Sequence, residues 1–211
     1  MGVTMKAMIC AALLLSATVG AGQAATITNG SFENGIDPGG FTTVEAGDNT
    51  SINGWTVGGV SVDYIGTYWQ AAQGVRSIDM SGNGMGSIST LITNLIAGVT
   101  YKITFAISGN PDDLNPAEKV IGVGIGEANL GEFGFTAVAD SKENMGWVDR
   151  VASFTANATS MTLRFFTVSP NNAFGPALDN VRISAVPVPA SGLLVFGALA
   201  GLALLRRRKA V

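Results

Sequence analysis

The stretch of sequence that decides the fold reads Tyr101-Lys102-Ile103-Thr104-Phe105-Ala106-Ile107-Ser108. Apolar residues alternate with polar or small residues over these eight positions, which is typical of a strand with one buried face. The same alternation recurs in Met161-Thr162-Leu163-Arg164-Phe165 and in Val181-Arg182-Ile183-Ser184. These three segments predict a chain that forms sheets.

Outward from these segments, the chain offers further strand candidates at residues 26–32, 60–65, 75–80, 86–92, 119–125, 133–139 and 147–156. Turn-forming clusters separate them, such as Ser81-Gly82-Asn83-Gly84 and Gly109-Asn110-Pro111-Asp112. No segment between the two ends of the chain repeats apolar residues at a helical spacing. Short strands with regular turns predict one all-β domain, a sandwich or jelly roll, over residues 26–185.

Residue composition limits the chemistry open to this domain. The chain has no histidine, and its single cysteine, Cys10, lies near the N-terminus. This excludes catalysis by Ser-His-Asp or Cys-His groups and the usual zinc ligand sets. Fifteen acidic residues leave a two-carboxylate glycosidase open in principle, but no pair stands out in the sequence. The composition therefore favours a domain that is not an enzyme.

The predicted domain is strongly acidic. Residues 26–185 contain seven basic residues and all fifteen acidic residues of the chain, a net charge of −8. A charge of this sign disfavours nucleic acids and anionic lipids as partners. It is compatible with binding of hard cations such as calcium.

The N-terminal residues 1–25 are typical of a signal peptide that signal peptidase removes. Lys6 provides a weak positive start, residues 7–19 are apolar, and Gly22-Gln23-Ala24 offers small residues for cleavage. Cys10 lies inside the apolar region, so the exported part would contain no disulfide. The core, and a metal ion if one binds, would have to hold the domain together.

The C-terminal residues 186–211 have three parts in a fixed order. A motif, Val186-Pro187-Val188-Pro189-Ala190, precedes an uncharged stretch at 190–205 and a basic tail at 206–209. Sixteen helical residues would rise about 24 Å, which is short of the roughly 30 Å of bilayer hydrocarbon. The basic tail would stay in the cytoplasm. This pattern predicts a hydrophobic helix at 190–205 that does not quite cross a bilayer. It fits a eukaryotic lipid-anchor signal poorly, because no polar spacer is present.

This tail resembles the PEP-CTERM sorting signals of Gram-negative bacteria, and its motif is closest to the class written Val-Pro-Leu-Pro-Ala (VPLPA-CTERM). The resemblance implies recognition by a membrane-embedded protease of the exosortase type, with cleavage near the step from Pro189 to Ala190. It also implies export across the inner membrane, transient insertion of 190–205 in that membrane, and a final location at the cell surface or in the extracellular matrix.

One acid in the predicted last strand is unusual. A period of two places Asp179 on the same face as Val181 and Ile183, which should be the core, where an unpaired carboxylate is costly. Two interpretations remain open: Asp179 is a calcium ligand, or it lies at the rim and accepts backbone N–H bonds. If the first and last strands lie side by side, Glu33 and Asp179 could share one ion.

The aromatic residues suggest a ligand surface. Trp55 and Tyr64 are expected in the core, because large aromatic side chains are usually buried. Tyr68 and Trp69 are adjacent, so on a strand one of them would point outward. They are predicted to bind a sugar face, and polar neighbours would bind its hydroxyl groups; the predicted ligand-binding residues are Tyr68, Trp69, Gln70 and Asn110, with Asp63 and Gln73 as further candidates.

Several motifs occur in a characteristic order: Asn29-Gly30-Ser31-Phe32-Glu33, Gly54-Trp55, Val62-Asp63-Tyr64-Ile65, Trp69-Gln70-Ala71, Ser77-Ile78-Asp79-Met80-Ser81-Gly82, Tyr101-Lys102-Ile103-Thr104-Phe105, Ser108-Gly109-Asn110-Pro111-Asp112 and Gly175-Pro176-Ala177-Leu178-Asp179-Asn180-Val181. Together they resemble the choice-of-anchor C family of bacterial surface proteins, which is related to a plant cell-wall family. The resemblance implies a galactose-binding-like jelly-roll β-sandwich. It also implies a structural calcium ion held by the Ser31 carbonyl and the carboxylates of Glu33 and Asp179.

The sequence therefore predicts an exported, exosortase-processed surface or matrix protein. Its non-catalytic sandwich is expected to bind extracellular polysaccharide. Two alternatives remain: a purely structural matrix protein without a defined sugar ligand, and a glycan-active enzyme.

Overall fold

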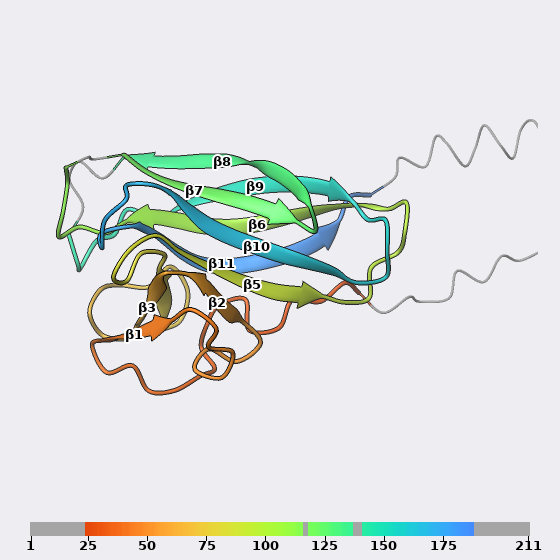
Figure 1. The fold of residues 1–211 in the computed structure, drawn as a ribbon. Helices are drawn as coiled ribbons and strands as arrows, with labels where there is room; N and C mark the ends of the chain where they lie inside the picture. The colour runs from red at the N-terminus through yellow and green to blue at the C-terminus, as the bar shows by residue number, and fades with distance from the viewer. Residues whose placement is uncertain (1–23, 116–117, 137–140, 188–211) are drawn as a thin grey trace, which may run out of the picture.

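Two antiparallel sheets packed face to face make up the computed structural model, which describes residues 24–115, 118–136 and 141–187 (Figure 1). The all-β sandwich predicted from the alternating segments is confirmed. The strands are β1 (Phe41–Glu45), β2 (Thr56–Gly59), β3 (Ser61–Ile65), β4 (Ser77–Asp79), β5 (Gly86–Ile92), β6 (Thr100–Gly109), β7 (Glu118–Ile125), β8 (Ala128–Thr136), β9 (Val148–Thr155), β10 (Met161–Ser169) and β11 (Pro176–Ala185).

The strand order shows a jelly-roll-like path that crosses between the layers. One sheet has the order β1-β3-β4-β11-β6-β9, and the other has β2-β5-β10-β7-β8. The last strand, β11, lies between β4 and β6, so the end of the domain is built into the middle of the larger sheet. Residues far apart in the sequence therefore meet on one sheet face.

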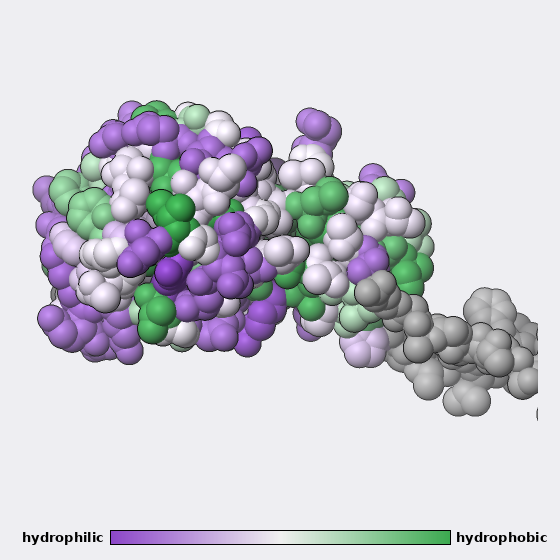
Figure 2. Space-filling view, turned by 90° about the horizontal axis from the view of Figure 1, so that it is seen from below, coloured by the Kyte–Doolittle hydropathy of each residue, from purple (hydrophilic) through white to green (hydrophobic). Residues whose placement is uncertain are grey.

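The core lies between the two sheets because each strand buries every second side chain. Phe105 of β6 and Phe165 of β10 meet edge to face across the layers, with ring centroids 5.1 Å apart. Trp55 and Tyr64 are fully buried beside them, as the sequence predicts. On the face seen in Figure 2, hydrophilic residues surround small separate apolar patches.

The N-terminal segment differs from the prediction. Residues 26–32 do not form a strand: Thr26 makes one isolated bridge to Thr93, and the chain then turns with positive φ at Asn29 and Phe32. Two strands that the sequence did not predict, β1 and β2, have only five and four residues. Their sequences, Phe-Thr-Thr-Val-Glu and Thr-Val-Gly-Gly, do not alternate apolar and polar residues along their length.

A bulge in β11 decides where its acid points. Asp179 pairs with Ala106 and Arg182 pairs with Thr104, so two residues of β11 oppose one residue of β6. The extra residue is accommodated at Asn180, whose φ is 53°. Leu178 and Val181 both enter the core, and Asp179 faces outward. The prediction that Asp179 shares the face of Val181 and Ile183 is therefore wrong, because the bulge reverses the alternation.

The first and last described segments lie at the same end of the sandwich (Figure 1). Thr26 bridges to Thr93 after β5, and the Val186 N–H donates to the Thr100 carbonyl at the start of β6. Across residues 24–115, 118–136 and 141–187 there is no helix that could span a membrane. The predicted signal peptide (1–25) and the hydrophobic stretch at 190–205 lie outside the described residues, apart from residues 24 and 25.

Candidate functional site

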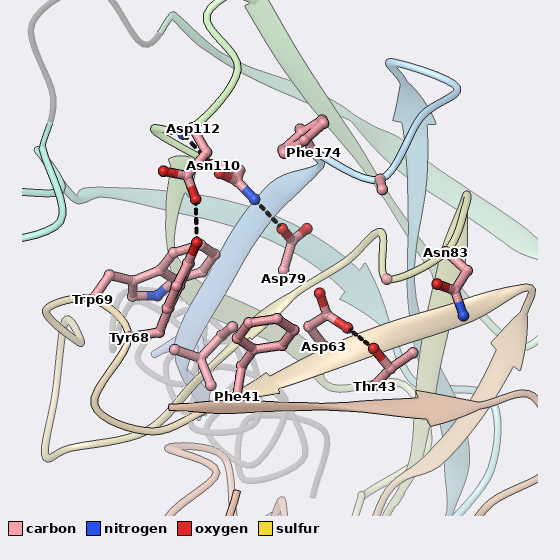
Figure 3. A pocket seen from close by; sticks show the side chains of 13 residues that line it. Phe41, Thr43, Asp63, Tyr68, Trp69, Asp79, Asn83, Asn110, Asp112 and Phe174 are labelled. Carbon is pink, nitrogen blue, oxygen red and sulfur yellow. Dashed lines mark hydrogen bonds between the residues drawn. The ribbon is translucent and has the colours of Figure 1, made fainter. Parts of the chain in front are cut away.

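A cleft of about 220 Å³ opens on the outer face of the six-stranded sheet, the face directed away from the five-stranded sheet (Figure 3). Strands β1, β3 and β4 form its floor, and the loops after β3, after β4, after β6 and before β11 form its walls. Its lining residues are Phe41, Thr43, Asp63, Ile65, Tyr68, Trp69, Asp79, Gly82, Asn83, Asn110, Asp112, Ala173 and Phe174.

The floor of the cleft is a row of three polar side chains that the strand register brings together. Thr43 of β1 pairs with Asp63 of β3, and Asp63 pairs with Asp79 of β4. Their neighbours along the strands, among them Val62 and Ile78, are in the core. Because side chains alternate between faces, the three polar groups must point outward into the cleft.

Asp79 is the best-anchored group of the cleft. It is fully buried, and its Oδ1 accepts the backbone N–H groups of Ser81 (2.9 Å) and Gly175 (3.1 Å). Its Oδ2 accepts the side-chain amide of Asn110 at 2.7 Å. Burial raises the pKa of Asp79 to about 7, against the lowering effect of these hydrogen bonds, and nearby Asp63 raises it further. One carboxyl group thus connects the loops that follow β4 and β6 to the loop that precedes β11.

Asp63 is the more accessible acid. The Thr43 hydroxyl donates to its Oδ1 at 2.6 Å. Burial raises the pKa of Asp63, the Thr43 bond lowers it, and the negative charge of Glu45 raises it again. Asp63 and Asp79 are directly opposite each other on neighbouring strands, an arrangement in which like charges repel.

Aromatic side chains stand beside this polar floor. The exposed fractions of Phe41 and Phe174 are 46% and 37%, which is high for phenylalanine. Phe41 meets Tyr68 edge to face at 5.0 Å. The Tyr68 hydroxyl donates to Asp112 Oδ2 at 2.6 Å, and Lys142 Nζ lies 3.9 Å from the centre of the Tyr68 ring and 2.9 Å from Asp112 Oδ1. Tyr68 is therefore held in place from two sides.

Three of the four predicted ligand-binding residues line this cleft. Tyr68 is half-buried, and Asn110 binds Asp79. Trp69 is only 5% exposed, and its indole N–H donates to the Ser77 hydroxyl at 2.8 Å, so it supports the wall and offers little ring surface. Gln70 does not line the cleft. Its backbone carbonyl accepts the indole N–H of Trp147, and its backbone N–H donates to the Lys142 carbonyl.

Sequence reasoning missed several groups of the cleft. Phe41 lies on the unpredicted strand β1, and Phe174 lies in a loop whose position depends on the neighbouring strands. Asp79 carried a usable signal, since it stands between the buried residues Ile78 and Met80, as Asp63 stands between Val62 and Tyr64. An acid between two core residues predicts a carboxylate on the outer face of the sheet.

Two of the three predicted calcium residues, Glu33 and Asp179, bind the same loop at a different place on this sheet face. Glu33 Oε1 accepts the N–H groups of Val75 and Arg76, both at 3.0 Å, and Asp179 Oδ2 accepts the N–H of Gln73 at 2.8 Å. Both carboxylates thus hold the loop that precedes β4. Gly74 in this loop has a φ of +70°, and a Cβ there would lie 2.3 Å from Glu33 Oε1.

Glu33 and Asp179 could bind a cation, but they provide only two carboxylates. Burial raises the pKa of Asp179 to about 7 despite its backbone hydrogen bonds, and the Glu33 charge contributes. Ser31, the third predicted ligand, lies in the turn just before Glu33. Within the described residues no group of three or more His, Cys, Asp or Glu side chains gathers, so any ion here would need backbone oxygens.

Sequence comparison finds one protein family and one curated relative that match this chain. The family described as "Protein of unknown function (DUF642)" matches residues 25–184. Halomucin of Haloquadratum walsbyi is 36% identical over 171 residues, which cover 79% of this chain and 2% of that protein. The chain thus spans only a small part of the curated relative that it matches.

Solved structures with a similar fold have low sequence identity. TmCBM61 in complex with β-1,4-galactotriose has 14% identity and a TM-score of 0.48, with 75% of this chain and 97% of that chain covered. A family 35 carbohydrate-binding module from Clostridium thermocellum has 9% identity and a TM-score of 0.43, with 69% and 92% covered. These similarities concern the fold alone.

Proposed function

The chain belongs to the DUF642 family of proteins of unknown function, and we propose that its sandwich is a non-catalytic module that binds an extracellular glycan in the cleft of Figure 3. The observation that carries this proposal is the pairing of exposed aromatic rings with fixed polar groups. Phe41 and Phe174 offer apolar surface, while Asp63, Asn83 and Asn110 offer hydrogen-bonding groups beside it. Sugar rings need both, because their C–H groups are apolar and their hydroxyls are polar.

The position of the two aspartates favours binding over hydrolysis. In glycosidases the two carboxyl groups flank the scissile bond, one acting on each side. Asp63 and Asp79 both lie on the floor of the cleft, on neighbouring strands. Both oxygens of Asp79 already accept N–H bonds, which leaves this group poorly placed to transfer a proton. Turnover of any glycan by the purified domain would contradict the assignment.

The proposal is tested by measuring retention of the domain on a panel of polysaccharides by affinity electrophoresis. Phe41→Ala is expected to weaken binding at least tenfold, because the ring lies at the exposed edge of the cleft. Phe166→Ala is the matched control, since this half-buried ring lies on the outer face of the other sheet, against Gly122. If no polysaccharide retains the domain, or Phe41→Ala binds like the wild type, the domain has a purely structural role instead.

We also propose that Glu33 and Asp179, with the Ser31 carbonyl, hold a structural calcium ion. What supports this is that both acids reach the same loop while burial disfavours the ionised form of Asp179. A bound cation would neutralise both carboxylates and tie the first turn of the domain to β11 and to the loop before β4. The alternative, in which backbone N–H bonds alone satisfy both acids, predicts no effect of calcium on stability.

For the ends of the chain we propose export followed by two cleavages. Signal peptidase would remove residues 1–25, and an exosortase-type protease would cut near Pro189 and Ala190 after transient insertion of 190–205 in the inner membrane. The support is the sequence pattern alone, together with the resemblance to the choice-of-anchor C family and to VPLPA-type signals. The product would be a protein of the cell surface or matrix of a Gram-negative bacterium. The mass of the mature protein recovered from the medium fixes both cleavage sites.

A further inference from the structure

We propose that the glycan recognised by the cleft carries a free amino group, so that the ligand is a deacetylated hexosamine whose ammonium group lies against Asp63. This inference rests on the proposed glycan-binding function and names the chemical class of its ligand. Its basis is a pair of acids at the floor of an open cleft, with aromatic side chains beside them and no basic side chain bonded to either acid among the described residues.

The charges around the cleft are unbalanced. Asp63 and Asp79 oppose each other across β3 and β4, and Glu45 adds a third negative charge that acts on Asp63. Within the described part of the chain the ion pairs are Lys142–Asp112 and Arg182–Asp149, and neither involves these two acids. A like-charge pair directly across two strands destabilises a sheet. Because burial raises the pKa of Asp79 to about 7, this repulsion grows as the pH approaches neutrality, and a cationic ligand would relieve it.

Lys119 is a basic residue whose pKa the negative charge of Asp79 raises, but it does not line the cleft. It extends from β7 of the other sheet into the interior and is fully buried, and its Nζ has no hydrogen-bond partner among the described residues. Burial lowers the pKa of Lys119, and the negative charges of Asp113 and Asp79 partly oppose this effect. The ligand therefore meets an acidic floor.

The oxygens that remain free suit an ammonium group. Among the described hydrogen bonds, Asp63 Oδ1 accepts from Thr43 while Oδ2 has no donor. Asp79 already accepts three N–H bonds. Calcium needs six to eight oxygen ligands, and N–H donors around Asp79 take up that capacity. An ammonium group needs only a few acceptors, and a charge-assisted bond to a carboxylate is among the stronger hydrogen bonds.

The aromatic side chains of the cleft also favour an ammonium group. Lys142 Nζ lies 3.9 Å from the centre of the Tyr68 ring, so an ammonium group already packs on an aromatic face at the edge of this cleft. Phe41 beside it leaves nearly half of its surface free. A uronic acid or a sulfated sugar would instead place a negative charge over Asp63 and be repelled.

The test compares two oligosaccharides that differ only at nitrogen: β-1,4-linked glucosamine oligomers and their fully N-acetylated counterparts. Calorimetric titration at pH 6.5 in chelator is expected to give at least tenfold tighter binding of the glucosamine oligomer, the effect of one charge-assisted bond. Asp63→Asn is expected to remove most of this preference. Asp149→Asn makes the same change in net charge at an exposed site of the same sheet and is expected to preserve it.

Each other outcome counts against the amino-sugar inference. Equal affinity for the two oligomers would overturn it while leaving the glycan-binding function intact, whereas failure of every glycan to bind would remove both. A preference for the glucosamine oligomer that survives in Asp63→Asn would reveal nonspecific attraction to an acidic domain. So would a preference that trilysine reduces to the same extent in the wild type and in Asp63→Asn. Calcium binding that Asp63→Asn abolishes would assign the two acids to a metal ion instead.

Discussion

Replacing Asp79 tests whether one buried carboxyl group organises the cleft. In Asp79→Ala, the N–H groups of Ser81 and Gly175 and the side-chain amide of Asn110 all lose their acceptor. A buried donor without a partner costs about 1–3 kcal/mol, so three of them cost about 3–6 kcal/mol after partial relaxation of the loops. This loss approaches the whole stability of a typical domain, which is about 5–15 kcal/mol.

Asp79→Asn separates hydrogen bonding from charge at the same position. Its carbonyl oxygen still accepts from Ser81 and Gly175, while its amide faces the amide of Asn110, so about one bond worth 1–2 kcal/mol is lost. Loss of the repulsion with Asp63 offsets part of this cost. The expected net change in the free energy of unfolding is within about 1.5 kcal/mol of the wild type, since these opposing effects are similar in size.

Urea denaturation of the purified domain, followed by tryptophan fluorescence, measures both variants. Asp149→Ala is the control, because its acid is largely exposed and pairs only loosely with Arg182 at 3.6 Å, so a change within about 0.5 kcal/mol is expected. If Asp79→Ala loses no more than Asp79→Asn, the three donors find other partners and Asp79 does not organise the cleft.

The same variants carry a pH signature. Burial raises the pKa of Asp79 to about 7 in the folded state, above the usual value of a free carboxyl group. The folded state therefore binds a proton that the unfolded state has already released between about pH 4 and pH 7, and stability falls as the pH rises through that range. The decrease from pH 5 to pH 8 should be smaller in Asp79→Asn than in the wild type. An unchanged pH slope would show that Asp79 is ionised without strain in the folded domain.

Two further predictions concern the first turn of the domain. A Cβ at residue 30 would lie 2.0 Å from the Val181 carbonyl oxygen, so Gly30→Ala should break the Val181-to-Gly30 hydrogen bond and cost more than about 1.5 kcal/mol by urea denaturation. Gly40→Ala, where a Cβ meets nothing within 4 Å, should change little, and equal effects would contradict the close approach. If Glu33 and Asp179 hold calcium, calcium at 100 times its Kd should stabilise the domain by about 2.7 kcal/mol. Glu33→Gln should abolish this gain, and a melting temperature that chelator leaves unchanged would exclude the site.

Alternation of apolar and polar residues along single strands predicts the sandwich. The same alternation places Asp63 on the outer face of its sheet. The long strands β6, β7 and β10 each direct alternate side chains into the core between the sheets, as Ile103, Phe105 and Ile107 of β6 do. The cleft itself depends on which strands are neighbours. Phe41 comes close to Tyr68 only because β1 pairs with β3, and Asn110 reaches Asp79 only because β11 lies between β4 and β6. No local pattern records such neighbours.

Asp79 and Asp179 show where the period of two fails. Each follows a core residue, Ile78 or Leu178, and each points to the outer face. For Asp79 simple alternation gives this result. For Asp179 alternation counted back from Val181 gives the opposite result, because Asn180 adopts a positive φ and adds a residue to β11. Asparagine tolerates that conformation better than most residues, so Asp179-Asn180 inside an apolar strand was itself a signal of a bulge. Counted forward from Leu178, the same sequence predicts a carboxylate outside the core, against the loop that it binds.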